Sequence, residues 1–178
     1  MDPANAILLN MKDNKVLQRL FDRDQLEREP KNYTANSLKV MKNDEKRRKQ
    51  AMLMLTQRKI KTGRDFYNAS MIFQHGQKVA DFMRARDLAY KSMGLGHTPA
   101  RWLFAAATDR FLVSQGKKQK FGTQYRMVAL KNKNRKTKRY FELAPYDKRT
   151  TDVVRAKFYV PPLKQLIRDA RKFTQKYS

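Results

Sequence analysis

The stretch TPARWLFAAATDRFLVSQG, residues 98–116, decides the fold class. Thr98 followed by Pro99 is a strong helix start, because threonine caps free backbone amides and proline fits the first helical position. Apolar residues are denser here than elsewhere in the chain, and Gly116 ends the run. The small side chains of Ala105–Ala107 let a neighbouring helix approach closely. We therefore expect a central helix in a mainly helical protein.

Upstream of this helix, apolar spacing and end signals predict four more helices. Pro30 closes the first, and the polar sequence KNYTANS forms a linker to the second. Asn43 caps the second helix, Gly63 ends it, and Asp65 opens the third. The expected ranges are 5–28, 43–62, 65–75 and 79–93.

Downstream of Gly116 the composition shifts toward aromatic and branched residues, which favour strands. Two such runs, FGTQYRMVAL (121–130) and RYFEL (139–143), are separated by the basic sequence KNKNRKTK. This arrangement predicts a two-stranded hairpin with a long basic tip.

The remaining chain is expected to contain a helical turn near 150–157, a break at Pro161-Pro162 and an amphipathic helix over 163–173. The predicted fold class is mainly α: a compact bundle of helical hairpins with a small two-stranded β-hairpin near residues 121–143. With 178 residues, 40% of them hydrophobic, the chain suits a single domain with a real core. Its expected segments are an N-terminal helix and linker (1–42), a helical core (43–116), the basic β-hairpin (117–145) and a C-terminal helical segment (146–178).

The net charge of the chain indicates which class of molecule it binds. The chain has 41 Lys and Arg against 16 Asp and Glu, a net charge of +25, and a pI of about 10.5. A polyanion is therefore the expected partner. Residues 31–64 hold 11 basic and 2 acidic residues and residues 116–140 hold 10 and none, whereas residues 65–115 hold 6 and 4. Such concentration is typical of a binding surface added to a fold.

Other classes of protein fit poorly. With no cysteine, disulfides and thiolate metal sites are excluded. His75 and His97 are the only histidines, and neither has a partner at metal-ligand spacing, so no metal or cofactor is expected. No apolar stretch is long enough to span a bilayer, and the first residues lack the basic-then-apolar order of a signal peptide. We expect an intracellular protein without a membrane partner, in the cytoplasm, a nucleoprotein particle or a virion.

Two basic clusters are candidate nucleic-acid-binding sites. The hairpin tip holds six cations within nine residues, which repel one another unless water or phosphates neutralise them. On the expected second helix, residues 42, 46 and 49 share one face and can follow a phosphate backbone. The alternatives are a solvated loop and an ordinary exposed helix face. The candidates are Lys131, Lys133, Arg135, Lys136, Lys138 and Arg139 at the tip, and Lys42, Lys46, Arg47, Lys49 and Arg58 on the helix.

A different constellation offers an enzymatic alternative. His75 could act as a general base, Asp109 could orient it, and Arg110 could hold a phosphate, with Gln124 in the same pocket. The same groups could instead cap helices and hold the turn formed by the sequence FGTQ (residues 121–124) through buried hydrogen bonds. No nucleophile, metal set or phosphate loop completes the site, so an enzyme is not the leading interpretation.

Several phrases in this order resemble one protein family. They are FDRDQLER (21–28), DFYNASMIFQHG (65–76), ARWLFAAATDRFL (100–112), GKKQKFGTQY (116–125) and TTDVVRAKFYVPPL (150–163). Together they resemble a widespread, mainly bacterial family known only as a domain of unknown function, with relatives in large DNA viruses. The resemblance covers roughly residues 20–167 and implies a compact helical fold, but no established activity. The basic KNKNRKTK departs from the family's usual pattern.

The sequence thus favours a non-enzymatic protein that binds nucleic acid or serves as a structural component of a nucleoprotein particle, such as a ribosome-like assembly or a virion. Its partners would be the phosphate backbone of RNA or DNA and other proteins of a large assembly. The first alternative is an enzyme acting on a phosphate-containing substrate. The second is a capsid-associated scaffold protein whose basic regions bind acidic protein surfaces.

Overall fold

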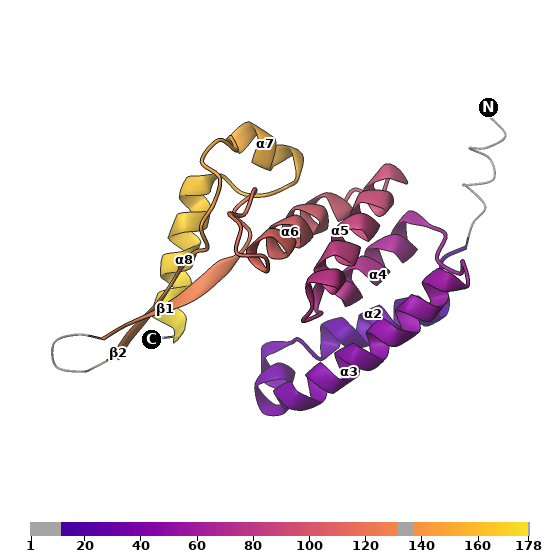
Figure 1. The fold of residues 1–178 in the computed structure, drawn as a ribbon. Coiled ribbons are helices and arrows are strands. Elements are labelled where there is room, and N and C mark those ends of the chain that lie inside the picture. The colour runs from indigo at the N-terminus through magenta and orange to yellow at the C-terminus, as the bar shows by residue number, and fades with distance from the viewer. Residues whose placement is uncertain (1–11, 132–136, 178) are drawn as a thin grey trace. The chain divides into compact units, whose positions relative to one another are not determined.

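The computed structural model describes residues 12–131 and 137–177 and divides the chain into two compact units (Figure 1). The first unit is Met1–Phe104 and the second is Ala105–Ser178, so the boundary falls within helix α6 (Ala100–Val113). The expected fold class is confirmed: the structure is mainly helical with one two-stranded antiparallel hairpin. The organisation as a single domain with four segments stays a prediction, and each unit is described by itself.

The first unit is built around α4 (Gly63–Gln74), which packs against α2 (Lys15–Leu26), α3 (Pro30–Thr56) and α5 (Val79–Gly94). The apolar face of α4 is buried, with Phe66, Ala69, Ile72 and Phe73 in the core. Removal of this face from water is the main force that holds the neighbouring helices against it.

Helix starts in this unit are fixed by side chains. The Asn14 side chain accepts from the first amides of α2, and Thr62 caps α4 together with Asp65 in a capping box. The buried Asp65 also accepts a hydrogen bond of 2.8 Å from the backbone amide of Asn14. One carboxylate therefore ties the start of α4 to the start of α2.

The expected boundary between the first two helices is wrong. Pro30 begins α3 instead of closing a helix, and α3 continues through the expected linker and through Asn43. The Asn43 side chain caps nothing; it donates to Glu27 at 2.9 Å. At the other end, α3 stops at Thr56, and Gly63 is the first residue of α4. Proline fits the first turn of a helix, which suits the start of α3 at Pro30, and the contact of Asn43 with Glu27 replaces the expected cap.

The second unit contains the hairpin and the C-terminal helices. Strands β1 (Tyr125–Lys131) and β2 (Thr137–Leu143) pair antiparallel, and α7 (Asp152–Lys157) and α8 (Leu163–Tyr177) follow. The aromatic ring of Phe173 on α8 lies 5.2 Å from Tyr125 and 6.4 Å from Phe141, centroid to centroid. The hairpin therefore gains its stability from α8, because two strands alone are marginal in water.

A buried ion cluster joins α2, α3 and the C-cap of α4 in the first unit. Asp24, fully buried on α2, lies 3.0 Å from Arg28 and 2.9 Å from Nδ1 of His75. Arg47 of α3, only 5% exposed, lies 3.5 Å from Asp24 and 2.6 Å from Asp44. Burial alone raises the pKa of Asp24, but the hydrogen bond and charge of His75 and the charges of Arg28 and Arg47 outweigh it, so the pKa is lowered.

We predict that Asp24→Asn destabilises the first unit by about 3–5 kcal/mol, because it leaves Arg47 buried without its full counter-charge. Urea unfolding followed by the fluorescence of the single tryptophan, Trp102, measures this. The control is Glu45→Gln, which removes an exposed pair with Lys49 and is expected to cost less than about 1 kcal/mol. Equal costs for the two variants would contradict a stabilising role of the cluster.

We also predict that the stability of the wild-type protein depends on pH through Asp24, and that Asp24→Asn changes this dependence. Since the pKa of Asp24 is lowered in the native state, its contribution is present above the ordinary carboxyl pKa and is lost as pH falls through the native value. Native stability should therefore fall below about pH 4. Asp24→Asn should flatten that fall, measured as the urea midpoint at each pH, and an unchanged profile would exclude Asp24 as its source.

Candidate nucleic-acid interface

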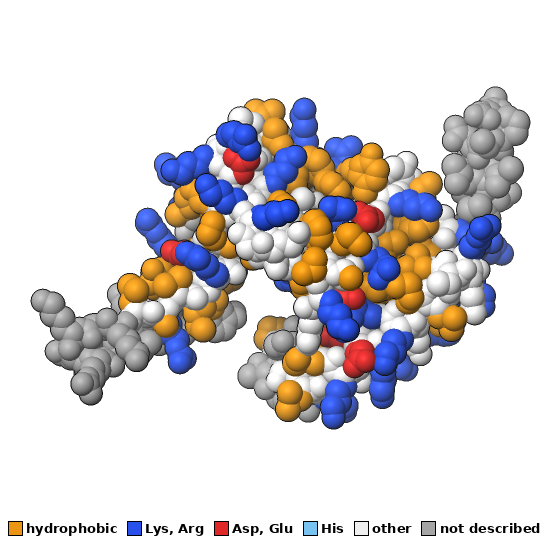
Figure 2. All heavy atoms as spheres, viewed as in Figure 1, with side chains coloured by type: hydrophobic (Ala, Val, Ile, Leu, Met, Phe, Trp, Pro, Cys, Tyr) orange, Lys and Arg blue, Asp and Glu red, His pale blue; other side chains and the backbone are white. Residues whose placement is uncertain are grey.

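The carboxylates of the described residues are engaged within their own units. Asp24, Asp44, Asp65 and Asp109 are buried, and several other acids pair with neighbouring cations, as Glu142 does with Arg126. Further pairs are Glu45–Lys49, Asp87–Arg86, Asp147–Arg149, Asp152–Arg155 and Asp169–Lys172. In Figure 2 the Lys and Arg side chains are accordingly spread over each unit with few carboxylates among them. The excess charge of the chain therefore lies at the surface.

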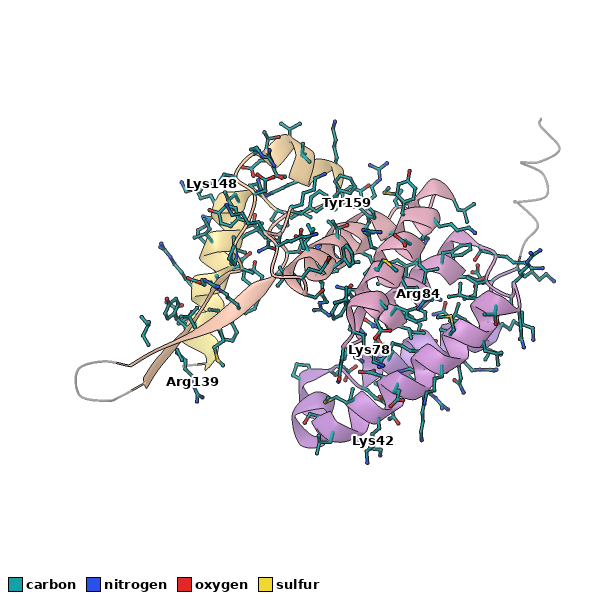
Figure 3. All side chains as sticks on the ribbon, in the orientation of Figure 1. Lys42, Lys78, Arg84, Arg139, Lys148 and Tyr159 are labelled. Carbon is teal, nitrogen blue, oxygen red and sulfur yellow. The ribbon has the colours of Figure 1, made fainter. Side chains whose placement is uncertain are left out.

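One local excess of positive charge on the first unit is a lysine row on α3. We define the α3 lysine face as Lys39, Lys42, Lys46 and Lys49, which fall on one side of the helix and are all exposed. Lys49 pairs with Glu45 at 2.8 Å, and the other three make no ion pair with any described carboxylate. Lys42 projects outward from α3 (Figure 3). The expected row of 42, 46 and 49 therefore exists as an accessible surface.

Two members of the predicted helical cluster are placed elsewhere. Arg47 is buried, and its guanidinium bonds Asp44 and Glu27 at 2.6 and 2.8 Å, so its expected role as a phosphate contact is wrong. Arg58 is exposed but follows the end of α3, with a left-handed φ of 54°, so it does not belong to the helix face. Helical spacing alone does not reveal which arginine of a run turns inward.

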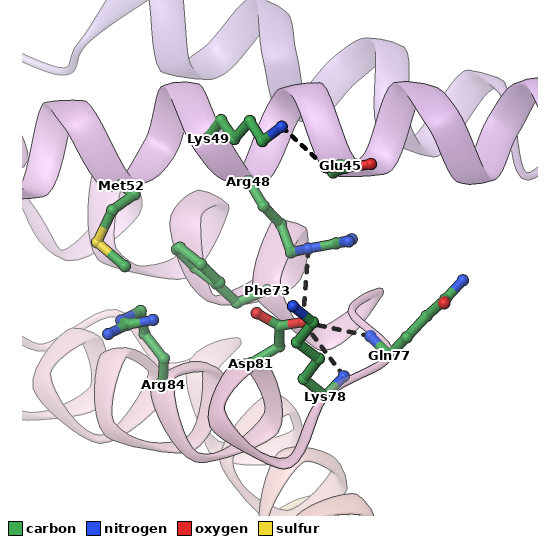
Figure 4. Close-up of a pocket in the computed structure, with 9 residues that line it drawn as sticks. All are labelled: Glu45, Arg48, Lys49, Met52, Phe73, Gln77, Lys78, Asp81 and Arg84. Carbon is green, nitrogen blue, oxygen red and sulfur yellow. Dashed lines mark hydrogen bonds and ion pairs between the residues drawn. The ribbon is translucent and has the colours of Figure 1, made fainter.

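Beside the α3 lysine face lies a pocket of about 420 Å³, bounded by α3, the end of α4 and the start of α5 (Figure 4). Its apolar lining residues are Met52 and Phe73. Arg48 and Lys49 line it from α3. Of these cations, the sequence predicted only Lys49 as a binding residue; Arg48 was not among the candidates, nor were the remaining two, Lys78 and Arg84 on the α5 side. Nothing in the local sequence marks these two residues, because the pocket is made by tertiary packing.

The cations of the pocket are held in place by their neighbours. Arg48 donates to the backbone oxygen of His75 at 3.2 Å and lies 3.6 Å from Asp81. The guanidinium carbon of Arg84 lies 5.3 Å from the centre of the Phe73 ring, a cation–π contact. Asp81 in turn accepts from the backbone amides of residues 77 and 78 at 3.3 Å, and a side chain at Gly76 would collide with it.

In the second unit, cations lie on α8 and on the hairpin. Lys164, Arg168 and Arg171 share one exposed face of α8, which we call the α8 cation face. Arg139 on β2 is exposed as well (Figure 3). The expected tip is shorter than residues 131–139, because the strands extend to Lys131 and resume at Thr137. Of the predicted tip residues, Lys133, Arg135 and Lys136 lie outside the described residues, as do the side chains of Lys131 and Lys138.

The residues of the enzymatic alternative fall in both units. In the second, the fully buried Asp109 accepts hydrogen bonds of 2.6, 2.9 and 2.9 Å from the amides of Lys120, Phe121 and Thr123, and one of 2.9 Å from the Thr123 hydroxyl. Arg110 donates to Gln124 at 3.2 Å. In the first unit, the partner of the His75 ring is Asp24. Asp109 thus pins the FGTQ turn, the structural role considered for it from the sequence.

Two further findings concern the described part of the chain. No group of three or more His, Asp or Glu side chains there is arranged to hold a metal ion. None of the described helices is both long and apolar enough to cross a membrane.

Comparison of the chain with protein-family models, with curated proteins and with solved structures gives no match. The family resemblance therefore rests on the sequence phrases alone.

We predict that Asp109→Asn destabilises the second unit by about 2–3 kcal/mol, because an amide nitrogen replaces an acceptor oxygen and leaves buried donors unpaired. Hydrogen exchange at the amides of Lys120, Phe121 and Thr123 should become faster. The control is Asp147→Asn, which alters a carboxylate paired with the exposed Arg149. Unchanged protection at the three amides would show that Asp109 is not what fixes the turn.

Proposed function

We propose that the protein binds nucleic acid by its phosphate backbone, with the α3 lysine face as the principal contact. The observation that supports this is the disposition of charge. Carboxylates are consumed inside each unit or in local pairs, whereas Lys39, Lys42 and Lys46 project without a described acidic partner. A row of lysines this close together gains free energy when phosphates replace its condensed counterions.

The geometry of the α3 lysine face suits a backbone contact. Lys39 and Lys49 are ten residues apart, which on a helix is about 15 Å, enough to meet several phosphates in succession. Lysine ammonium groups act as point charges and carry no code for base edges. We therefore expect strong salt dependence and weak sequence preference, as in a structural component of a nucleoprotein particle.

A second contact surface is the α8 cation face. Lys164, Arg168 and Arg171 make no ion pair with a described carboxylate, and the apolar side of the same helix is used against the hairpin. Arginine suits this role because its planar fork can bind a phosphate with two hydrogen bonds. Each unit would thus bring its own phosphate contacts.

We predict that Lys42→Gln/Lys46→Gln lowers the slope of log affinity against log salt by about 1.8 for duplex DNA, two lost phosphate contacts at about 0.9 each. Fluorescence anisotropy with generic duplex and single-stranded DNA and RNA across a salt series measures this. The matched control is Lys59→Gln/Lys61→Gln, two exposed lysines in the loop after α3 with the same change of charge.

If both variants changed the slope equally, bulk charge rather than the α3 lysine face would carry the binding. Negligible binding of the wild-type protein to every nucleic acid at moderate salt would overturn the proposal. Salt-sensitive binding to an acidic protein surface under the same conditions would then favour the scaffold alternative.

A further inference from the structure

The pocket beside the α3 lysine face combines two chemistries. Its lining includes the apolar side chains of Met52 and Phe73 together with four cations and two carboxylates. The ligand that matches such a site has a flat, weakly polar part and an anionic part. A volume of about 420 Å³ lies within the range typical of small-molecule sites.

The two carboxylates do not cancel the positive charge. Asp81 already accepts two backbone hydrogen bonds and faces Arg48, while Glu45 pairs with Lys49. The hydrogen bond and charge of Lys49, together with the charges of Arg48 and Lys78, lower the pKa of Glu45. Three cations therefore act on one exposed carboxylate, and the local field favours an incoming anion.

Two side chains that line the pocket, Arg84 and Met52, could contact the apolar part of a ligand. The guanidinium carbon of Arg84 lies 5.3 Å from the centre of the Phe73 ring, and both Arg84 and Met52 line the pocket (Figure 4). Arginine planes and methionine side chains are surfaces on which an unpaired base can stack. Gln77, exposed at the rim, offers an amide to the edge of such a base.

The pocket is continuous with the proposed backbone contact, because Lys49 belongs both to the α3 lysine face and to the pocket lining. A strand whose phosphates follow Lys42 and Lys46 would reach the pocket at its next positions. A base can enter only if it is unstacked and unpaired, as in a single strand.

We propose that this pocket binds one unpaired nucleotide, with its base against Arg84 and Met52 and its phosphate near Lys49 and Lys78. This inference rests on the proposed nucleic-acid binding and names the form that the protein prefers, a single strand over a duplex. The nucleotide can be part of a strand or free, since the chemistry recognised is the same.

The first test compares a single-stranded oligothymidylate with a DNA duplex of equal length at one salt concentration. Lys78→Gln/Arg84→Met should weaken single-strand binding about tenfold and duplex binding much less, since only the unpaired base reaches the pocket. Methionine at position 84 keeps an apolar cover on Phe73, and Lys78→Gln alone, at an exposed site, tests the same idea without disturbing that cover. The control of equal charge is Lys59→Gln/Lys61→Gln.

The outcomes separate the two proposals. If Lys42→Gln/Lys46→Gln weakens binding of both nucleic acids but the pocket variant weakens them equally or not at all, the backbone contact stands and the pocket inference is wrong. If no nucleic acid binds the wild-type protein, the proposed function itself fails.

A second test uses free ligands and a readout at the pocket. AMP should shift the methyl resonance of Met52 and the side-chain amide resonances of Gln77, and the pocket variant should abolish these shifts. Inorganic phosphate should leave Met52 unchanged. Equal shifts with phosphate and AMP would show that the pocket binds anions without recognising a base, which would contradict the inference. The absence of a shift with both AMP and an oligothymidylate would also overturn it.

Discussion

The interaction on which the rest of the first unit depends is the buried ion cluster between α2 and α3. Arg47 of α3 bonds Asp44 and Glu27 at 2.6 and 2.8 Å and lies 3.5 Å from the buried Asp24 of α2, so removing a carboxylate would leave a buried cation without its full counter-charge. Arg28, Asp44 and the ring of His75 complete the cluster. Buried ion pairs of this kind contribute less to net stability than an apolar core would, but loss of one partner is costly. On α3, Asp44 and Arg47 are buried in the cluster, whereas the lysines of the α3 lysine face are exposed.

The burial of carboxylates also affects the charge of the protein surface. Acids that are buried, such as Asp44, Asp65 and Asp109, accept hydrogen bonds that the fold requires. The chain has 16 acidic residues against 41 basic ones, a net charge of +25, and the burial of some of these acids leaves still fewer to neutralise lysines at the surface. Self-repulsion of this size opposes the compact state, so a polyanion that relieves it would also stabilise the protein.

Much of the fold could be predicted from the sequence because strong local signals coincide with the tertiary structure. The Thr98-Pro99 start of α6, the hairpin and the range of α5 are examples. Asn43 and Arg47 show where such prediction fails: the first is an excellent cap residue and the second lies on a basic run, yet both bond Glu27 of another helix. Lys78 and Arg84 could not be found at all, because their proximity to Met52 depends on the packing of α3 against α4 and α5.

His75 links the buried cluster to the pocket. Its ring lies against Asp24, and its backbone oxygen accepts from Arg48, which lines the pocket. The residue is also the C-cap of α4, so both contacts are made where the backbone leaves the helix and turns toward α5. Arg48 is therefore held in place by contacts within the unit, so less conformational freedom would be lost if the proposed anion bound beside it. His75, which the sequence offered as a general-base candidate, therefore contacts both the buried ion cluster and a residue that lines the pocket.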